Sequence, residues 1–332
     1  MLHIGLDTHK EFIQACFVND EGKKIKEERY PNTPIGLSKL CAAAQNGKCV
    51  LEASTSCITA YDALKAQGIR VRAANPLKIK AIASAKLKTD KVDAHMLAQL
   101  ERADLIPEAH LPDKFTREMR ELVRQHVSIT NERTDIKNQI RALLAKNGIR
   151  LPFKSTFTQK SQSWLSKNTA GVAKLALEQT FQRIHLLNQQ REVIDAEIER
   201  QAQNNPDAVL LKTIPGLGWF SAFLLAVEID GVERFVDEEH LQSYAGLVPS
   251  VRQSGNTTRV GHISKQGNRL IRWVLVQDAW MAIRRSKRYK KKYTRMVRRH
   301  KKKTVAILAV ARKILRDAFF MLQRRQAFNE NA

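Results

Sequence analysis

Four acidic residues in the first hundred positions have the types and spacing of a catalytic metal site. Asp7 ends an otherwise apolar run and Glu52 ends the apolar run 49–51, where core packing would favour Leu or Val. Asp90 and Asp93 are three residues apart, which places both on one face of a helix. Carboxylates that converge repel one another unless cations neutralise them. Two divalent ions held roughly 4 Å apart would also clamp the attacking and leaving oxygens of a phosphodiester.

We therefore predict that Asp7, Glu52, Asp90 and Asp93 are catalytic residues that bind Mg²⁺, with Mn²⁺ as an alternative and two ions in each site. The competing interpretation is structural. In that case Asp90 is a helix N-cap after Thr89, and Asp93 is a first-turn acid that interacts favourably with the helix dipole.

The sequence around these acids alternates between strand-like and helix-like segments. Three strands form a meander, and the full order β-β-β-α-β-α-β-α predicts a mixed sheet flanked by helices. In such a sheet the first and fourth strands end side by side and the last helix crosses over them, so the four carboxylates converge. The predicted segments are residues 2–6, 12–18, 25–30, 34–45, 49–53, 58–67, 69–74 and 90–102.

Two later stretches have the apolar spacing of long packed helices. Between residues 116 and 147 apolar residues recur every seven positions. In a second stretch, between residues 184 and 198, apolar residues are spaced three or four residues apart. Pro152 and the Ser/Thr-rich residues around it predict a break that turns the two helices into a hairpin. Apolar seams of this kind also favour a homo-oligomer, which we expect to be a dimer or a tetramer. The seam residues are Leu122, Ile129, Ile136, Ile140 and Leu143, then Ile184, Leu187, Ile194 and Ile198.

The charge balance indicates a polyanionic partner. The chain has 57 Lys and Arg against 33 Asp and Glu, a formal net charge of +24, which in a folded protein points to nucleic acid. One run near the C-terminus contains no acid, and we predict that it binds the phosphate backbone. A solvated charge run is the alternative. Its residues are Arg284, Arg285, Lys287, Arg288, Lys290, Lys291, Lys292, Arg295, Arg298, Arg299, Lys301, Lys302 and Lys303.

Residues 211–225 have the layout of a helix, a Pro-Gly-x-Gly turn and another helix. A helix-hairpin-helix motif of this kind presents backbone N–H groups to a phosphate at a helix N-terminus. A plain turn between two helices, without a ligand, has the same pattern, so both interpretations stay open.

Other features point to a reduced compartment. No apolar run is long enough to span a membrane and no signal peptide precedes the first strand, so we expect a cytoplasmic protein. The four cysteines are Cys16, Cys41, Cys49 and Cys57, without zinc-ligand spacing, and are expected to be reduced core thiols.

The chain resembles the transposases of insertion-sequence family 110 over almost its whole length. Six segments occur in the family's order, and their combination is specific although no single one is. They are Asp-Thr-His-Lys at 7–10, Lys-Thr-Asp-Lys-Val-Asp-Ala at 88–94, Ile-Pro-Gly-Leu-Gly at 214–218, Tyr-Ala-Gly-Leu-Val-Pro at 244–249, Ser-Gly at 254–255 and Ile-Ser-Lys-Gln-Gly at 263–267.

The resemblance implies a fold, a reaction and partners. The four acids match the family's DEDD residues in a RuvC-like, ribonuclease H type domain, and Ser254 matches its nucleophilic serine. The family's reaction is metal-dependent cleavage and exchange of donor and target double-stranded DNA, guided by a structured bridging RNA. After Glu52 the sequence reads Ala53-Ser54, where family members often have Thr-Gly, so the turn lacks its glycine.

We accordingly expect three parts: a RuvC-like domain at 1–110, a coiled-coil spacer at 111–205, and a mainly helical domain at 206–332 with the helix-hairpin-helix-like motif, the serine and the basic run. Two other functions remain open. A junction-resolving endonuclease would use water as the nucleophile and Ser254 would be structural. A non-catalytic nucleic-acid-binding protein would rely on the hairpin and the basic run alone.

Overall fold

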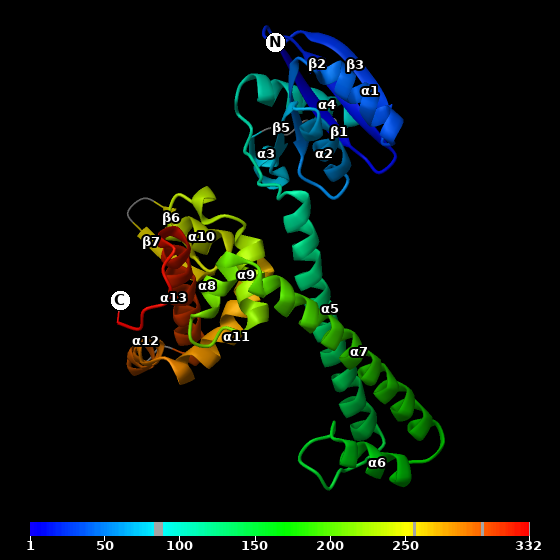
Figure 1. Ribbon diagram of the computed structural model, residues 1–332, viewed down its shortest axis with the longest axis vertical. Coiled ribbons are helices and arrows are strands. Elements are labelled where there is room, and N and C mark those ends of the chain that lie inside the picture. The colour runs from blue at the N-terminus through cyan, green and yellow to red at the C-terminus, as the bar shows by residue number, and fades with distance from the viewer. Residues whose placement is uncertain (83–88, 255–256, 300–301, 332) are drawn as a thin grey trace. The chain divides into compact units, whose positions relative to one another are not determined.

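The computed structural model describes residues 1–82, 89–254, 257–299 and 302–331 (Figure 1). The chain divides into two compact units, residues 1–112 and residues 113–332. Each unit has its own hydrophobic core, and each is described by itself.

The N-terminal unit is built on one five-stranded mixed sheet of order β3-β2-β1-β4-β5. The first three strands are antiparallel neighbours, and β4 and β5 run parallel to β1. The predicted mixed α/β sheet is therefore confirmed, and its strand order and directions are consistent with a RuvC-like domain. Its elements are β1 (Leu2–Thr8), β2 (Phe12–Val18), β3 (Lys24–Pro31), α1 (Pro34–Ala44), β4 (Gly47–Glu52), α2 (Ile58–Ala66), β5 (Arg70–Ala74), α3 (Pro76–Ile82) and α4 (Asp90–Arg102).

The two faces of β1 pack against different parts of the unit, because successive side chains of a strand point to opposite faces. Ile4 and Leu6 are fully buried in a core that they share with Leu40 of α1 and Leu64 of α2. The intervening position Gly5 lies against α4 instead. The strand is therefore anchored by apolar residues on one face, which leaves the other face for α4 and for Asp7.

Two long helices, α5 (Lys114–Lys146) and α7 (Gly171–Gln203), pack side by side with α6 (Gln159–Asn168) between them in sequence (Figure 1). Their shared core joins Ile136 and Ile140 of α5 to Leu177, Ile184 and Leu187 of α7. The two long helices and the break between them are confirmed. Their apolar seams are covered within one chain, so supercoiling and pairing between chains stay predictions.

The predicted heptad line along α5 is only partly right. Ile129 and Ile136 are buried as expected, but at both ends of the line the fully buried residues are the next ones along, Val123 and Leu144. Val123 belongs to the core that α5 shares with α9, and Leu122 packs against that same core. Leu144 belongs to the core that α5 shares with α7, and Leu143 packs against it. The buried face of α5 is therefore wider than a single heptad line.

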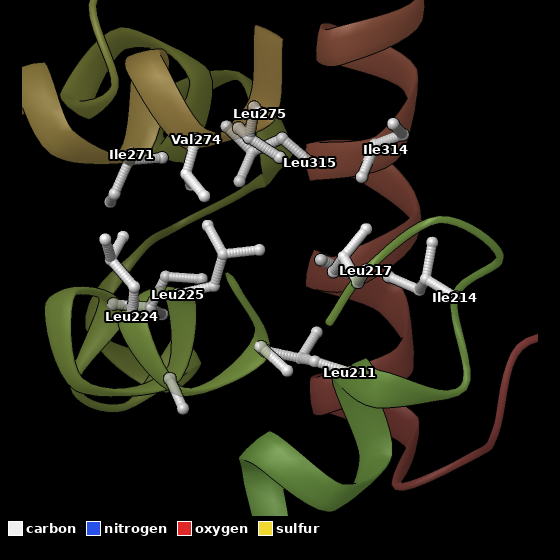
Figure 2. Close-up of a cluster of buried hydrophobic side chains, with 14 of the residues drawn as sticks. Leu211, Ile214, Leu217, Leu224, Leu225, Ile271, Val274, Leu275, Ile314 and Leu315 are labelled. Carbon is white, nitrogen blue, oxygen red and sulfur yellow. The ribbon is translucent and has the colours of Figure 1, made fainter. Parts of the chain in front are cut away.

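The rest of the second unit is mostly helical, as predicted, with one β-hairpin. Figure 2 shows its core, where Leu224 of α9, Ile271 and Leu275 of α11, and Ile314 and Leu315 of α13 converge. The elements are α8 (Pro206–Lys212), α9 (Trp219–Ile229), a 3₁₀ turn (Val232–Arg234), α10 (Glu238–Tyr244), β6 (Pro249–Ser254), β7 (Thr257–Ile263), α11 (Arg269–Arg285), α12 (Lys287–Arg298) and α13 (Lys303–Arg324).

All four cysteines are buried free thiols, as predicted. Burial raises the pKa of Cys49 to about 12, so this thiol is not a reactive nucleophile. Among the described residues, no helix has the length and apolar character needed to cross a bilayer.

Candidate active site

The first two predicted acids lie at the same edge of the sheet. β1 and β4 are parallel, and Leu6 is the register partner of Leu51. Asp7 and Glu52 each follow one position later, at the carboxyl ends of neighbouring strands. In-register neighbours in a parallel pair point to the same face, so both carboxylates belong to the face that α4 covers.

Helix α4 reaches this face because residue 5 is glycine. A Cβ at Gly5 would lie 2.0 Å from the Ala94 carbonyl oxygen and 2.4 Å from the Ala98 nitrogen. The helix backbone therefore rests directly on β1. At the other end of α4, Arg72 Nε of β5 donates to the buried Glu101 Oε2 at 2.8 Å, which fixes the helix across the sheet.

The start of α4 holds the other two acids. The N-cap is Thr89, whose hydroxyl accepts from the Val92 N–H, so the alternative that Asp90 caps the helix is wrong. Asp90 and Asp93 are the acids of the first turn and both are half-buried. Burial is the largest influence on Asp7 and raises its pKa; His9 opposes the rise, whereas the charges of Asp90 and Asp93 add to it. The acids are thus close enough to affect one another.

His9 is a site residue that the sequence analysis missed. Its Nε2 lies 3.2 Å from Asp7 Oδ2 and 3.4 Å from Asp90 Oδ1. The imidazole is held in place by a turn in which the His9 N–H donates to the Phe12 carbonyl, and by contact with the Phe12 ring at 4.7 Å between centroids. The Arg29 guanidinium covers the same ring at 3.9 Å. A histidine two residues after a strand-end acid was the available signal.

Ser254 is the last residue of β6 and pairs with Thr257 across the β6–β7 hairpin. Residues 255–256 lie outside the described part of the chain. Two further serines, Ser250 and Ser264, are alternative nucleophiles near Ser254 in the sequence. Ser250 donates its hydroxyl to the His262 carbonyl at 3.1 Å. Ser264 follows β7, and its N–H donates to the Val248 carbonyl.

At the base of this hairpin, the segments 244–249 and 263–268 cross each other in close backbone contact. The Asn268 N–H donates to the Tyr244 carbonyl at 2.6 Å. A Cβ at Gly267 would lie 2.3 Å from that same carbonyl, and one at Gly246 would lie 2.7 Å from the Gln266 carbonyl. Both glycines have positive φ, so they allow a backbone crossing that other residues would block.

The hairpin base is also tied to α9. The buried Glu228 accepts from Asn268 Nδ2 at 2.8 Å and pairs with Arg124 at 3.2 Å, and Asn268 caps the first turn of α11. Arg120 donates to the Val227 carbonyl from α5. The strand that ends in Ser254 therefore starts from a rigid support.

The basic run occupies the end of α11, all of α12 and the start of α13. Arg288 is an exception, because it points inward and donates to Asp317 at 3.0 Å and to the Asn329 carbonyl at 2.8 Å. Lys292 is half-buried, and burial followed by the charges of Arg295 and Arg312 lowers its pKa. Lys301 lies outside the described residues. The exposed members are Arg284, Arg285, Lys287, Lys290, Lys291, Arg295, Arg298, Arg299, Lys302 and Lys303.

One face of α12 is hollowed and cationic. Spacings of three and four residues place its members on the same side of the helix. No acid belongs to this lining, which consists of Lys287, Lys290, Lys291, Thr294, Arg295, Arg298 and Arg299.

The Pro-Gly-x-Gly segment joins α8 to α9 as a helix, a turn and a helix. Gly216 has φ +107° and lies against the backbone of α11, where a Cβ would be 2.7 Å from the Ala282 nitrogen. Gly218 caps α9 without a side-chain hydrogen bond and has open space around its Cβ position. The turn is confirmed, whereas phosphate binding there stays a prediction.

Two family models match the chain, one described as a transposase at residues 4–147 and one as the IS116/IS110/IS902 transposase family at residues 208–294. The first is the DEDD domain model of IS110 transposases and spans all four predicted acids. The chain belongs to the IS110 family of transposases. It is a DNA-transposing enzyme of insertion sequences, and its reaction is DNA recombination.

This transposase is also similar to individual proteins whose names describe transposition or DNA inversion. It is 30% identical over 198 residues to y4qE of Sinorhizobium fredii, named as a transposase, with 59% of the chain and 48% of that relative covered. It is 24% identical to the transposase for insertion sequence element IS1111A of Coxiella burnetii, covering 86% and 78%. The pilin gene-inverting protein of Moraxella bovis is 32% identical over 128 residues, covering 38% and 40%.

A DEDD transposase domain implies a divalent metal ion. The residues of this transposase fit one, because Asp7, His9 and Asp90 each offer a ligand atom and these atoms lie within 4.8 Å of one another. Two carboxylate oxygens and one imidazole nitrogen form a donor set suited to a divalent ion of the first transition row. Glu52 lies on the same edge of the sheet, and Asp93 acts on Asp7 through its charge.

Proposed function

We propose that this transposase cleaves and exchanges DNA strands in a metal-dependent reaction at Asp7, Glu52, Asp90 and Asp93, with Ser254 as the nucleophile. The observation that carries the proposal is the meeting of Asp7, His9 and Asp90 where β1 ends beside the first turn of α4. A strand order of β3-β2-β1-β4-β5 and a helix seated on Gly5 support a RuvC-like, ribonuclease H type catalytic domain.

The acids would hold one or two divalent ions, Mg²⁺ or Mn²⁺. When bound there, such an ion neutralises charge on the phosphodiester. The residues around it act by position: Gly5 lets α4 approach, the turn at His9 aims the imidazole at two carboxylates, and Arg29 lies 3.8 Å from Asp90 Oδ2. His9 is in our proposal an additional ligand of the site.

Ser254 would make the covalent bond. Its Oγ attacks the phosphorus of a phosphodiester, so a new Oγ–P bond replaces one P–O bond to the sugar. The proton lost by the hydroxyl balances the proton gained by the released sugar oxygen. A sugar hydroxyl of the second DNA then attacks the serine ester and frees Ser254. Ser250 is a weaker candidate, since its hydroxyl is already donated to the His262 carbonyl.

Donor and target DNA would be selected by a structured guide RNA, as in the family that the chain resembles. The exposed cations of α11, α12 and the start of α13 would bind phosphate, and the turn before α9 would offer free N–H groups to a further phosphate. We propose three working parts, a catalytic domain at 1–110, a helical spacer at 111–205 and a serine domain at 206–332, and assembly as a dimer or tetramer.

The test is strand exchange by the full chain, purified from cells together with its element and any RNA that accompanies it. We expect recombinant DNA product in Mg²⁺ or Mn²⁺ and none in EDTA, and we expect sequencing of the retained RNA to give one structured species encoded beside the gene. Product formed in EDTA would contradict the metal site. Full activity of RNA-free protein would contradict the guide.

A further inference from the structure

The hairpin formed by α5, α6 and α7 carries a second group of positive charges, separate from the basic run near the C-terminus. Across residues 136–177 the sequence contains no Asp or Glu. The same 42 residues contain eight cations: Lys137, Arg141, Lys146, Arg150, Lys154, Lys160, Lys167 and Lys174. Such one-signed density repels itself unless a polyanion balances it.

Part of this charge is concentrated on one side of the hairpin. Arg133, Lys137 and Arg141 are four residues apart and therefore lie on one face of α5. Lys137 Nζ and the Arg141 guanidinium cover the Phe157 ring at 5.3 Å and 5.2 Å. From Arg133 to Arg141 the helix rises about 12 Å, a length that faces several consecutive phosphates of a strand.

Arg191 of α7 adds a fourth cation to the same side. Burial and then the charges of Arg133, Arg141 and Arg191 lower the pKa of Lys137, and burial followed by Arg191 lowers the pKa of Arg133. These four side chains therefore lie close enough to repel one another. We call Arg133, Lys137, Arg141 and Arg191 the hairpin cation cluster.

Little in the described chain neutralises this cluster. Asp195 pairs with Arg191 at 3.1 Å but also with His126 at 3.0 Å. Within the described ranges no carboxylate lies at ion-pair distance from Lys137 or Arg141, and the buried Arg133 Nε has no hydrogen-bond partner. On α7, by contrast, Lys174 pairs with Glu178 at 3.9 Å and Arg200 pairs with Glu197 at 2.6 Å.

We propose that the hairpin cation cluster binds the phosphate backbone of a nucleic-acid duplex, as a second attachment surface besides α12. Lys and Arg side chains supply the charge, and the contact does not depend on base sequence. It is independent of the catalytic proposal, because phosphate binding needs neither the acids nor Ser254.

The test measures the salt dependence of binding with full-length protein in EDTA, so that no strand cleavage contributes. The probes are a 30-base-pair DNA duplex and an RNA duplex of the same length, both of arbitrary sequence. The variant Lys137→Gln/Arg141→Gln removes two charges, and with them the two cation–π contacts to the Phe157 ring. Its matched control is Lys174→Gln/Arg200→Gln, which removes two charges that are paired with Glu178 and Glu197 on α7.

Each lost phosphate contact reduces the slope of log affinity against log salt by about 0.9 for duplex DNA. We expect the slope to fall by about 1.8 for the cluster variant on at least one duplex and by much less for the control, and a cooperative thermal transition to show that both variants are folded. Loss on DNA alone identifies DNA at the hairpin, and loss on RNA alone identifies RNA. Unchanged slopes on both duplexes, or equal losses in variant and control, would overturn the proposal.

Discussion

His9 Nε2 lies 3.2 Å from Asp7 Oδ2, so the imidazole contacts the carboxylate at the end of β1. The same nitrogen reaches Asp90 Oδ1 at 3.4 Å. One histidine therefore joins the acid that ends a strand to the acid that begins a helix. In the site that we propose, two oxygens and one nitrogen are the ligands, a set that differs from an all-carboxylate site in metal preference.

We predict that His9→Ala weakens Mn²⁺ binding about tenfold and Mg²⁺ binding much less, because imidazole favours Mn²⁺ over the harder Mg²⁺. Free Mn²⁺ measured by electron paramagnetic resonance gives the first affinity, and competition with Mg²⁺ gives the second. The matched control is His185→Ala, which removes an exposed histidine of α7. Nitrogen coupling on bound Mn²⁺ that persists in His9→Ala would show that His9 is not a ligand.

Asp7→Asn and Asp90→Asn should each slow strand cleavage by a factor on the order of 100 or more, because each removes a proposed metal ligand. The affinity for DNA should change little. In the proposed mechanism the carboxylates bind metal, whereas the exposed cations bind the duplex. Cleavage is followed on denaturing gels and affinity by filter binding. Glu21→Gln removes an exposed acid of the same unit and should have no effect. Cleavage near the wild-type rate in Asp7→Asn would rule out the acidic site.

Gly5→Val should displace α4 and lower the free energy of unfolding by about 3 kcal/mol, because even a Cβ would lie 2.0 Å from the Ala94 carbonyl. Cleavage should fall with it, since Asp90 and Asp93 move with the helix. Gly68→Ala is the control, because open space surrounds Gly68 and only its positive φ resists substitution. Urea unfolding measures both. Equal stability of the two variants would mean that α4 does not depend on Gly5.

Much of the N-terminal unit could be predicted from the sequence. Apolar alternation predicted the strands and helices, and Asp7 and Glu52 at the ends of apolar runs lie at one edge of the sheet, as expected. His9 was missed although it stands two residues after Asp7, because the contact of its imidazole with Asp7 depends on the turn in which the His9 N–H donates to the Phe12 carbonyl.

The second unit was harder to predict for a similar reason. The heptad line along α5 followed one edge of a wider buried face, so Val123 and Leu144 were overlooked as core residues. Arg288 looked like one more phosphate-binding cation, but it pairs with Asp317, which comes from a helix 29 positions along the chain. Contacts between distant segments decide such cases, and residue type alone does not.

Stability should depend on pH through Asp278. Burial raises the pKa of Asp278 from 3.8 to about 7, and the hydrogen bond from Ser221 opposes part of the rise. A raised folded pKa means that the native state binds the proton more tightly than the unfolded chain. The contribution of protonated Asp278 to the free energy of unfolding is therefore complete below about pH 4 and is lost as the pH rises to about 7.

Asp278→Asn keeps the acceptor for Ser221 and cannot ionise, so it should flatten this part of the pH dependence and stabilise the protein relative to wild type at pH 8. Urea unfolding at pH 5 and pH 8 measures the difference. Glu121→Gln, at an exposed position of α5, should leave the wild-type dependence unchanged. A wild-type dependence in Asp278→Asn would place the effect elsewhere.

The most direct measurement is whether DNA cleaved by the transposase carries the protein on Ser254. Wild-type protein with its RNA, Mg²⁺ and a DNA substrate from its element is stopped in detergent, and the labelled DNA is separated on a denaturing gel before and after protease. We predict a slow DNA band that protease shifts, a phosphate ester at Ser254 in the digested peptide, and the same adduct in Ser250→Ala and Ser264→Ala but none in Ser254→Ala. Cleaved DNA ends that carry no protein in the wild-type reaction, or an adduct that persists in Ser254→Ala, would contradict the serine mechanism.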